Sequence, residues 1–420
     1  MCKVVLKQTT VTRNRVDFSY LYPDAWNVFV CDPSERLFAE YDFDLAEVPK
    51  SILNILFVSN MLVLAMFEDG NIYVDELDRD FYEAIPNILD GYRWLYPDRK
   101  IDCHVHCQQL VDNRYTPSET RLLAFTGGVD ATSALASHAE EKLVLVNIWG
   151  GDIRFDNEVR YQSHARYFRQ LAQNMGNGFA LVKSNFRFLY NDSKIPVQFD
   201  QDWWAAVGHS LLIIATFAPI AYRFKAEKIY MGSGYTTKEY LERRPASCNY
   251  SGIVNAVRIA SCAAVQCDGD LTRTEKINNI TQKLNLEKTG KIQILACWRH
   301  LKDSTVNCSG CEKCARTIMN IIACKADPNM FGFNVTDRTY THIRVLIGGS
   351  RDLPEEMWRE IQQAFQADKP YWKKNKRVNW IFKLKINQPN RNFFYISMKL
   401  YWGLRRICGL IKRKLMNIGK

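Results

Sequence analysis

The sequence predicts an α/β protein whose middle part, residues 119–345, is built around a parallel sheet. Three observations support this fold class. Short apolar stretches alternate with amphipathic ones, Gly127-Gly128 joins one apolar stretch to the next amphipathic one, and four cysteines cluster near the end of this part. Repeated strand–helix–strand crossovers give a parallel sheet with helices on both faces. We expect a separate α+β domain over residues 1–118, and a helical segment with a basic tail over 346–420.

The individual elements follow from the spacing of apolar residues, which differs between strands and helices. In the first part we expect a strand or hairpin over residues 3–19, a buried helix near 50–66, a strand over 71–74 after the turn Asp69-Gly70, a helix over 81–95 and a strand over 101–110. In the middle part we expect strands over residues 121–125, 142–148, 178–182 and 228–231, and helices over 131–140, 158–174 and 204–224.

The composition is that of a globular protein. The chain has 420 residues, of which 47% are hydrophobic and 24% charged, and this excludes disordered, collagen-like and low-complexity classes. The first residues, MCKVVLKQTT, have no apolar stretch like a secretory signal, so we expect a cytoplasmic protein with reduced thiols. In a reducing compartment, clustered cysteines indicate metal binding or catalysis rather than disulfides.

Two apolar stretches, Ser51–Phe67 and Trp203–Tyr222, contain no charged residue and approach the length of a membrane span. Both contain polar residues, among them Asn54 and His209, and both lie between segments of soluble character. Buried helices are therefore the favoured interpretation.

The string Phe125-Thr126-Gly127-Gly128-Val129-Asp130-Ala131-Thr132 lies directly between a predicted strand and a predicted helix. Two glycines allow a tight turn with exposed N–H groups, and the helix start adds a partial positive charge. Such a turn can bind a phosphate, although it can also be a plain strand-to-helix connection. It is not the Gly-Lys-Ser/Thr type of phosphate loop.

Four cysteines, Cys297, Cys308, Cys311 and Cys314, have the spacing of a tetrahedral thiolate site. Four protein ligands leave no open position, so a bound metal is expected to be structural. Zinc is the first expectation, an iron–sulfur cluster is the competing occupant, and unpaired thiols are the remaining alternative. In Cys103-His104-Val105-His106-Cys107, a strand would point cysteines and histidines to opposite faces, which disfavours a shared metal.

The glycine string resembles the Ser-Gly-Gly-x-Asp-Ser loop of the PP-loop ATP pyrophosphatases, with Thr126 and Ala131 in place of the two serines. This loop, followed by Cys-x10-Cys-x2-Cys-x2-Cys, resembles the 7-cyano-7-deazaguanine synthases over roughly residues 119–330. That family has Pro-Gly-Arg-Asn where this chain has Val207-Gly208-His209-Ser210. The resemblance implies the adenine nucleotide alpha hydrolase-like fold. The departure at His209, in a region that the family uses for its ligand, favours a different substrate from that of the family.

The resemblance further implies an ATP-dependent ligase or amidating enzyme, which activates a small-molecule carboxylate as an acyl-adenylate and releases pyrophosphate. Its cofactors would be ATP, Mg²⁺ and Zn²⁺, the zinc lying on the four cysteines. Asp130 and Thr126 would act in catalysis, with Asp130 also helping to hold Mg²⁺. The ATP phosphates would lie on Thr126, Gly127, Gly128, Val129, Asp130, Ala131 and Thr132, the adenine near Asn147, Ile148 and Trp149, and the substrate on His209, Gly232 and Ser233.

Two alternatives remain open. One is an ATP-dependent nucleoside thiolase, for which Cys248 is the candidate reactive thiol. The other is a non-catalytic nucleotide-binding scaffold that docks at a membrane. Two further residues have two interpretations each: Lys183 can reach a phosphate or be solvated, and Asp152 can contact a ligand or shape a turn.

The basic tail carries most of the net charge of +11: residues 369–420 contain fifteen Lys/Arg and no acid, leaving −4 for the rest. Within it, residues 393–418 mix basic with aromatic and aliphatic residues. Such a segment can lie on an anionic membrane surface, contact an acidic protein, or be a solvated terminus; nucleic acid is the least favoured partner. The chain is therefore expected in the cytoplasm, with a peripheral association at the inner membrane surface as one alternative.

Overall fold

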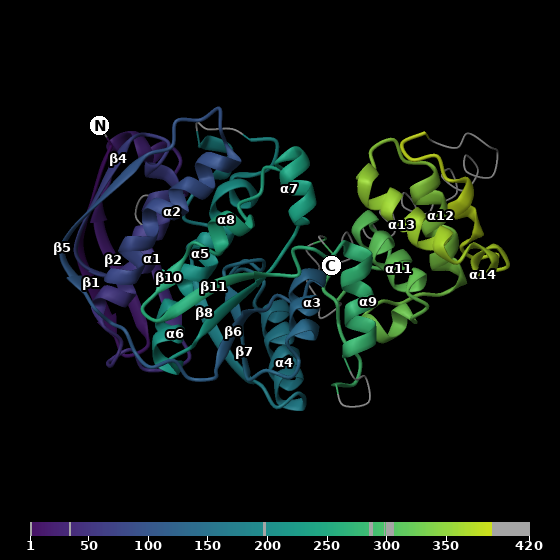
Figure 1. Cartoon of the computed structure of the whole chain (residues 1–420), viewed down its shortest axis with the longest axis horizontal. Coiled ribbons are helices and arrows are strands. Elements are labelled where there is room, and N and C mark those ends of the chain that lie inside the picture. Colours follow the sequence, from purple (N-terminus) through teal and green to yellow (C-terminus); the bar gives the residue numbers. More distant parts are fainter. Residues whose placement is uncertain are drawn as a thin grey trace, which may run out of the picture. The chain divides into compact units, whose positions relative to one another are not determined.

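The computed structural model describes residues 2–32, 35–195, 199–284, 289–297, 299 and 306–388 (Figure 1). The chain forms two compact units. The sheet unit comprises the described residues up to Thr272 together with a piece from Gln282 to Gly290, and the helical unit comprises Arg273–Thr281 and the described residues from Lys291 onward.

The sheet unit contains one sheet of eleven strands, in the order β10-β11-β9-β6-β7-β8-β3-β2-β1-β4-β5. The strands are β1 (Lys3–Thr12), β2 (Arg15–Leu21), β3 (Phe38–Tyr41), β4 (Gly70–Asp78), β5 (Cys103–Val111), β6 (Arg121–Ala124), β7 (Leu143–Trp149), β8 (Gly178–Ser184), β9 (Lys228–Gly232), β10 (Arg258–Ile259) and β11 (Cys262–Cys267). The five strands β8, β7, β6, β9 and β11 pair in parallel, and β10 is antiparallel at the edge. The α/β class with a large, mostly parallel sheet is thus as predicted.

The first 111 residues contribute five strands to the same sheet. Strands β1, β4 and β5 pair in parallel, whereas β2 pairs antiparallel with β1 and β3. Antiparallel pairing of β3 with β8, in which Tyr41 lies opposite Val182, joins these strands to the parallel half. The sheet is therefore continuous across residue 118, where the sequence suggests a domain boundary.

Helices cover this sheet, namely α1 (Lys50–Ala65), α2 (Arg79–Leu95), α3 (Val129–Ser137), α4 (Glu158–Asn174), α5 (His209–Thr216), α6 (Ala218–Phe224), α7 (Thr237–Arg243) and α8 (Ser251–Val254). A single π-helical turn, η3 (Trp204–Gly208), precedes α5. Helix α1 packs against β4, α5 and α6, so it is surrounded by protein. All of its residues from Ser51 to Ala65 are buried.

Both apolar stretches are buried helices, as expected. Within the described residues, the helical run Trp204–Phe224 is long and apolar enough to cross a membrane, but 89% of its most apolar window is buried inside the protein. In α1, the amide of Asn54 is satisfied internally, since it accepts from Thr9 Oγ1 at 2.7 Å and donates to the carbonyl of Glu76 at 2.8 Å. The apolarity of both helices is thus explained by their place in the core.

The helical unit contains α9 (Arg273–Lys283), α11 (Glu312–Ala323), α12 (Asp337–Gly348), α13 (Glu355–Ala367) and α14 (Lys369–Lys373). Helix α11 packs against α12 and α13, with Ile318 and Trp358 in the buried interior. The helical segment expected after residue 346 includes α13, and the suggested boundary at residue 345 falls inside α12. The predicted tail segment 393–418 lies outside the described residues.

Candidate functional site

The glycine turn connects β6 to α3. Gly127 has a backbone φ of +72°, in the left-handed region where glycine is favoured. Gly128 precedes the helix with an ordinary φ of −67° and offers no side chain to cap the first N–H groups of α3. A Cβ atom at Gly128 would meet only Thr126 Oγ1, at 3.5 Å. The fold itself therefore does not require glycine at residue 128, and the space beside this backbone is open to a ligand.

The end of β9 lies against the start of α3. Strand β9 pairs with β6 on the side opposite β7, so the chain changes direction in the sheet at this point. In open parallel sheets, ligands bind at such a point, at the carboxyl ends of the strands. Gly232 ends β9, and its carbonyl accepts from Asn249 Nδ2 at 2.7 Å.

A cavity of about 260 Å³ opens at these strand ends. Its lining includes seven of the site residues predicted from the sequence, and also Asp152. Its lining residues are Ala124, Phe125, Thr126, Gly128, Asp130, Ala131, Val146, Ile148, Gly151, Asp152, Trp204, Ala205, His209, Ile213, Phe217, Met231, Gly232, Gly234, Ser247 and Asn249. The glycine turn, the end of β7, the start of α5 and the loop after β9 thus converge on one space.

The other predicted residues do not line the cavity; these are Gly127, Val129, Thr132, Asn147, Trp149 and Ser233. Asn147 stabilises the glycine turn, because its Nδ2 donates to the carbonyl of Phe125 at 2.8 Å. Trp149 stacks on Tyr161, with ring centroids 4.7 Å apart. The hydroxyl of Ser233 donates to the carbonyl of Tyr235. Val129 and Thr132 are buried, so their side chains belong to the packing of α3.

His209 is held in the cavity wall by the π-helical turn before it. A π turn leaves carbonyl groups without their usual helical partners. Here the hydroxyls of Tyr92, in α2, and of Tyr96, its C-cap residue, donate to the carbonyls of Val207 and Ala206, each at 2.6 Å. Removal from water lowers the pKa of His209, so the imidazole is neutral at pH 7. Residues of the first 118 thereby shape the cavity, a role that sequence analysis did not find.

The described residues that line the cavity include two acids and no lysine or arginine. Among its lining residues, the ionisable ones besides neutral His209 are Asp130 and Asp152. Arg187 is not one of the lining residues but contacts two of them: its Nη1 donates to Asp152 Oδ1 at 3.2 Å and to the carbonyl of Gly151 at 2.9 Å. Lys183 lies with its ammonium 4.8 Å from the ring centre of Trp149, away from the cavity. Within the described lining, backbone N–H groups, together with a divalent cation, could neutralise bound phosphates.

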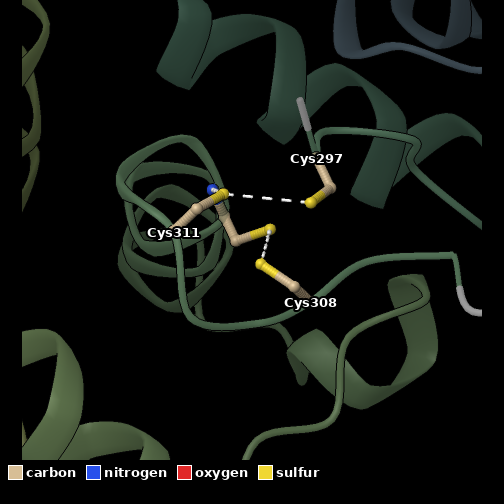
Figure 2. A group of neighbouring side chains, drawn as sticks. Cys297, Cys308 and Cys311 are labelled. Atoms are coloured by element: carbon tan, nitrogen blue, oxygen red, sulfur yellow. Dashed lines mark hydrogen bonds between the residues drawn. The ribbon is translucent and has the colours of Figure 1, made fainter. Parts of the chain in front are cut away.

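The four predicted cysteines come together in the helical unit. Figure 2 shows the sulfur atoms of Cys297, Cys308 and Cys311 pointing toward one another. The Sγ atoms of Cys297 and Cys311 are 3.9 Å apart and those of Cys308 and Cys314 are 3.8 Å apart. All four lie within 4.8 Å of one another. Since Zn–S bonds are about 2.3 Å long, sulfurs around a tetrahedral zinc are about 3.8 Å apart, so this group can hold a metal such as zinc.

The backbone around the cysteines is arranged for thiolates. Cys308 Sγ accepts from the N–H of Gly310, and Cys311 Sγ accepts from the N–H of Cys314, both at 3.5 Å. Cys311 is the N-cap of α11, where the partial positive charge of the helix favours a negative sulfur. Ser309, with φ of +51°, makes the tight turn between Cys308 and Cys311.

Asn307 links the two cysteine-bearing segments and was missed by sequence analysis. Its Oδ1 accepts from the N–H groups of Ala296 and Cys297, at 3.0 and 3.1 Å, and its Nδ2 donates to the carbonyls of Ile294 and Gly332, at 2.8 and 3.0 Å. The signal that the sequence offered was the place of Asn307 directly before Cys308.

Proton sharing among the thiols makes their pKa values diverge. The Cys314 thiol and other N–H and S–H donors bonded to Cys311 lower the pKa of Cys311 to about 4. The hydrogen bond between Cys314 and Cys311 raises the pKa of Cys314, and burial raises the pKa of Cys308. Metal binding to this cluster would therefore release protons.

A second group of possible metal ligands, Asp69, Asp102 and His104, lies at the ends of β4 and β5. Lys100 Nζ donates to Asp69 at 2.9 Å, and Arg93 donates to Asp102 at 3.2 Å. Both carboxylates thus already have cationic partners. In β5, Cys103 is buried and His104 exposed, which agrees with the expected alternation along this strand.

No protein-family model matches this chain, and none of the curated proteins compared with it matches in sequence.

Proposed function

We propose that this protein is an ATP-dependent adenylating enzyme of the PP-loop type, similar to the 7-cyano-7-deazaguanine synthases, that activates a small-molecule carboxylate. One observation carries the proposal. The uncapped start of α3 faces a cavity at the carboxyl ends of β6 and β9, and the glycine there, Gly128, is one that the fold does not need. A bare backbone with outward N–H groups suits a phosphate chain.

In the proposed reaction, a carboxylate oxygen of the substrate attacks the α-phosphorus of ATP. The bond from that phosphorus to the bridging oxygen breaks, and pyrophosphate leaves. An amine then attacks the acyl carbon, AMP leaves, and the amine loses a proton. The protein would contribute positioning and charge stabilisation, with Thr126 and the first N–H groups of α3 near the phosphates. Asp130 and Asp152 line the cavity and offer the oxygen ligands that Mg²⁺ prefers.

In this proposal the adenine contacts Ile148, and the substrate lies near His209 and Gly232. Zinc on Cys297, Cys308, Cys311 and Cys314 has a structural role, because four protein ligands leave no open position. The thiolase alternative is weakened by Cys248. This thiol is buried, and its burial raises its pKa to about 12, so it stays protonated and a poor nucleophile.

The second candidate is a nucleotide-binding protein without catalysis. The described residues of the cavity lining include no Lys or Arg, which favours this candidate, because phosphoryl chemistry usually draws on cationic side chains. The two candidates differ in whether ATP is consumed.

The test is an ATP–pyrophosphate exchange assay with Mg²⁺ and a collection of carboxylate metabolites, followed by an assay for AMP. Carboxylate-dependent exchange is expected for the wild type and loss of exchange for Asp130→Asn. Glu140→Gln, an exposed acid just beyond α3, is the matched control and should exchange like the wild type. ATP binding without exchange or AMP would favour the non-catalytic candidate, and no ATP binding would reject both.

A further inference from the structure

The helical unit carries a basic surface segment that the proposed reaction and the metal cluster do not involve. Residues 369–385 contain seven Lys/Arg and no acid. They form α14 (Figure 1), the turns that follow it and the short helix η5 (Asn379–Lys383). All seven basic residues are exposed. We call them the lysine patch, which consists of Lys369, Lys373, Lys374, Lys376, Arg377, Lys383 and Lys385.

The segment that bears the patch is folded onto helix α13. The ring of Trp372, in α14, packs against that of Phe365 with the ring centres 5.0 Å apart. Nε2 of Gln362 donates to the carbonyls of Ile381 and Leu384, at 3.0 and 2.9 Å. Gln362 and Phe365 are three residues apart in α13, so they lie on the same side of this helix. The two ends of the segment are therefore held next to each other, and their basic residues belong to one surface.

The positive charge of the patch is largely uncompensated by acids of this chain. Arg377 pairs with Asp337 at 2.7 Å, whereas the six lysines make no ion pair within the described residues. Asp368, at the start of the segment, is bound to Lys325 at 2.7 Å. Asp352 approaches the end of the segment through the hydrogen bonds of its chain neighbour, and it offsets at most one lysine. The patch therefore keeps an excess of positive charge on a folded surface, which attracts an extended anionic partner.

An anionic lipid surface fits this patch better than a nucleic acid does. Six of the seven basic residues are lysines, which attract a charged surface as point charges, whereas forked contacts to nucleic acid favour arginine. Tyr371 lies among the lysines and is 53% exposed, and tyrosine suits the boundary between lipid headgroups and water. The sequence that follows, residues 393–418, mixes basic with aromatic and aliphatic residues, and a lipid interface accepts both kinds.

We propose that the lysine patch docks this protein on a membrane surface that contains anionic phospholipids. The lysines meet the headgroup phosphates, and Tyr371 enters the headgroup layer beside them. Clusters of four to eight basic residues are attracted to such surfaces. The inference is independent of the proposed function, because it concerns residues of the helical unit that have no part in the proposed reaction.

The experiment is co-sedimentation of the full-length protein with vesicles. One kind of vesicle is phosphatidylcholine alone, and the other is an equal mixture of phosphatidylcholine and phosphatidylglycerol. We expect binding to the mixed vesicles alone, and weaker binding as the salt concentration rises, because salt screens exposed charges. Lys373→Gln/Lys374→Gln/Lys376→Gln should lower the affinity for the mixed vesicles about tenfold or more. The same three positions changed to arginine should keep the wild-type affinity, because the charge is retained.

Lys7→Gln/Lys142→Gln/Lys194→Gln is the matched control, since it removes the same charge from exposed lysines of the sheet unit. It should bind the mixed vesicles like the wild type, and circular dichroism checks that both variants are folded. The proposal is overturned if the wild type binds both kinds of vesicle alike or neither, if the patch variant keeps the wild-type affinity, or if both variants lose affinity equally. Binding of a mixed-sequence RNA duplex without binding of the mixed vesicles would assign the patch to nucleic acid instead.

Discussion

Gly232 lies against the backbone of Asp130: a Cβ atom at residue 232 would lie 2.6 Å from both the carbonyl carbon and the carbonyl oxygen of Asp130. These residues are about a hundred positions apart in the chain, and they bring the end of β9 to the first turn of α3. Only glycine permits this approach, and the cavity wall depends on it.

Gly232→Ala is therefore expected to lower the melting temperature, because the added methyl group forces α3 away from β9 at a cost of about 1–3 kcal/mol. Gly234→Ala is the stability control, since no atom lies within 4 Å of the Cβ position there. Thermal unfolding followed by circular dichroism measures both variants. Equal melting temperatures for the two would contradict the close approach.

Gly128→Ala tests the open space beside the turn. Its φ of −67° suits alanine, so the loss of stability should stay within about 1 kcal/mol, the usual range for a change at a helix N-cap. The methyl group would occupy the space assigned to phosphates, so ATP affinity should fall about tenfold or more. Calorimetric titration with ATP and Mg²⁺ measures this. Unchanged affinity in a folded variant would remove the observation on which the proposed function rests.

Cys311→Ser is expected to abolish metal binding. Metal analysis of the wild type should give about one zinc per chain, and the variant should lose both the zinc and much of its solubility. Zinc should also dissociate from the wild type as the pH falls, because protons compete for the thiolates. Cys324→Ser is the matched control: this thiol lies in the same unit but donates to the carbonyl of Thr274 at 3.6 Å, outside the cluster. Equal zinc content in both variants would argue against the site.

Asn307→Ala is expected to weaken zinc binding without removing a ligand. The change leaves two N–H groups and two carbonyls without their partner, and a lost bond to a buried group costs about 1–3 kcal/mol. Asn307→Asp keeps the acceptor for Ala296 and Cys297 and should have an intermediate effect. Competition with a chromophoric chelator measures the affinities. Wild-type affinity in Asn307→Ala would show that the cysteine segments hold their positions alone.

His164→Phe is expected to reduce the acid sensitivity of the fold. His164, in α4, is 5% exposed, and burial lowers its pKa from 6.5 to about 4. The unfolded chain binds a proton below pH 6.5 that the folded chain does not, so stability falls as the pH drops from 6.5 toward 4. The difference amounts to up to about 3 kcal/mol.

In addition, Nε2 of His164 has no hydrogen-bond partner among the described residues, so phenylalanine removes an unsatisfied group at this position. Thermal unfolding between pH 4 and 7 should show a shallower decline for His164→Phe than for the wild type. His104→Gln, which changes an exposed histidine, is the control with a wild-type slope. Identical slopes for all three proteins would mean that His164 is not the group responsible.

Sequence reasoning found those elements whose signal is local. Strands β6, β7, β8 and β9 are short apolar runs, and each coincides with an expected strand. Strand β11 was missed, because Cys262–Cys267 is short and rich in small residues, and it is a strand through its pairing with β9. Three of the residues expected to contact adenine or substrate, Asn147, Trp149 and Ser233, lie outside the cavity lining. Their side chains instead contact Phe125, Tyr161 and Tyr235, respectively.

The sequence alone determined the ligand set of the cysteine cluster and the glycine turn, because both depend on residue types a few positions apart. The tertiary structure alone decided that β1 to β5 continue the sheet and that Tyr92 and Tyr96 hold the wall containing His209. Those arrangements join segments up to about 150 residues apart, and their free energy comes from packing and pairing that no local pattern encodes.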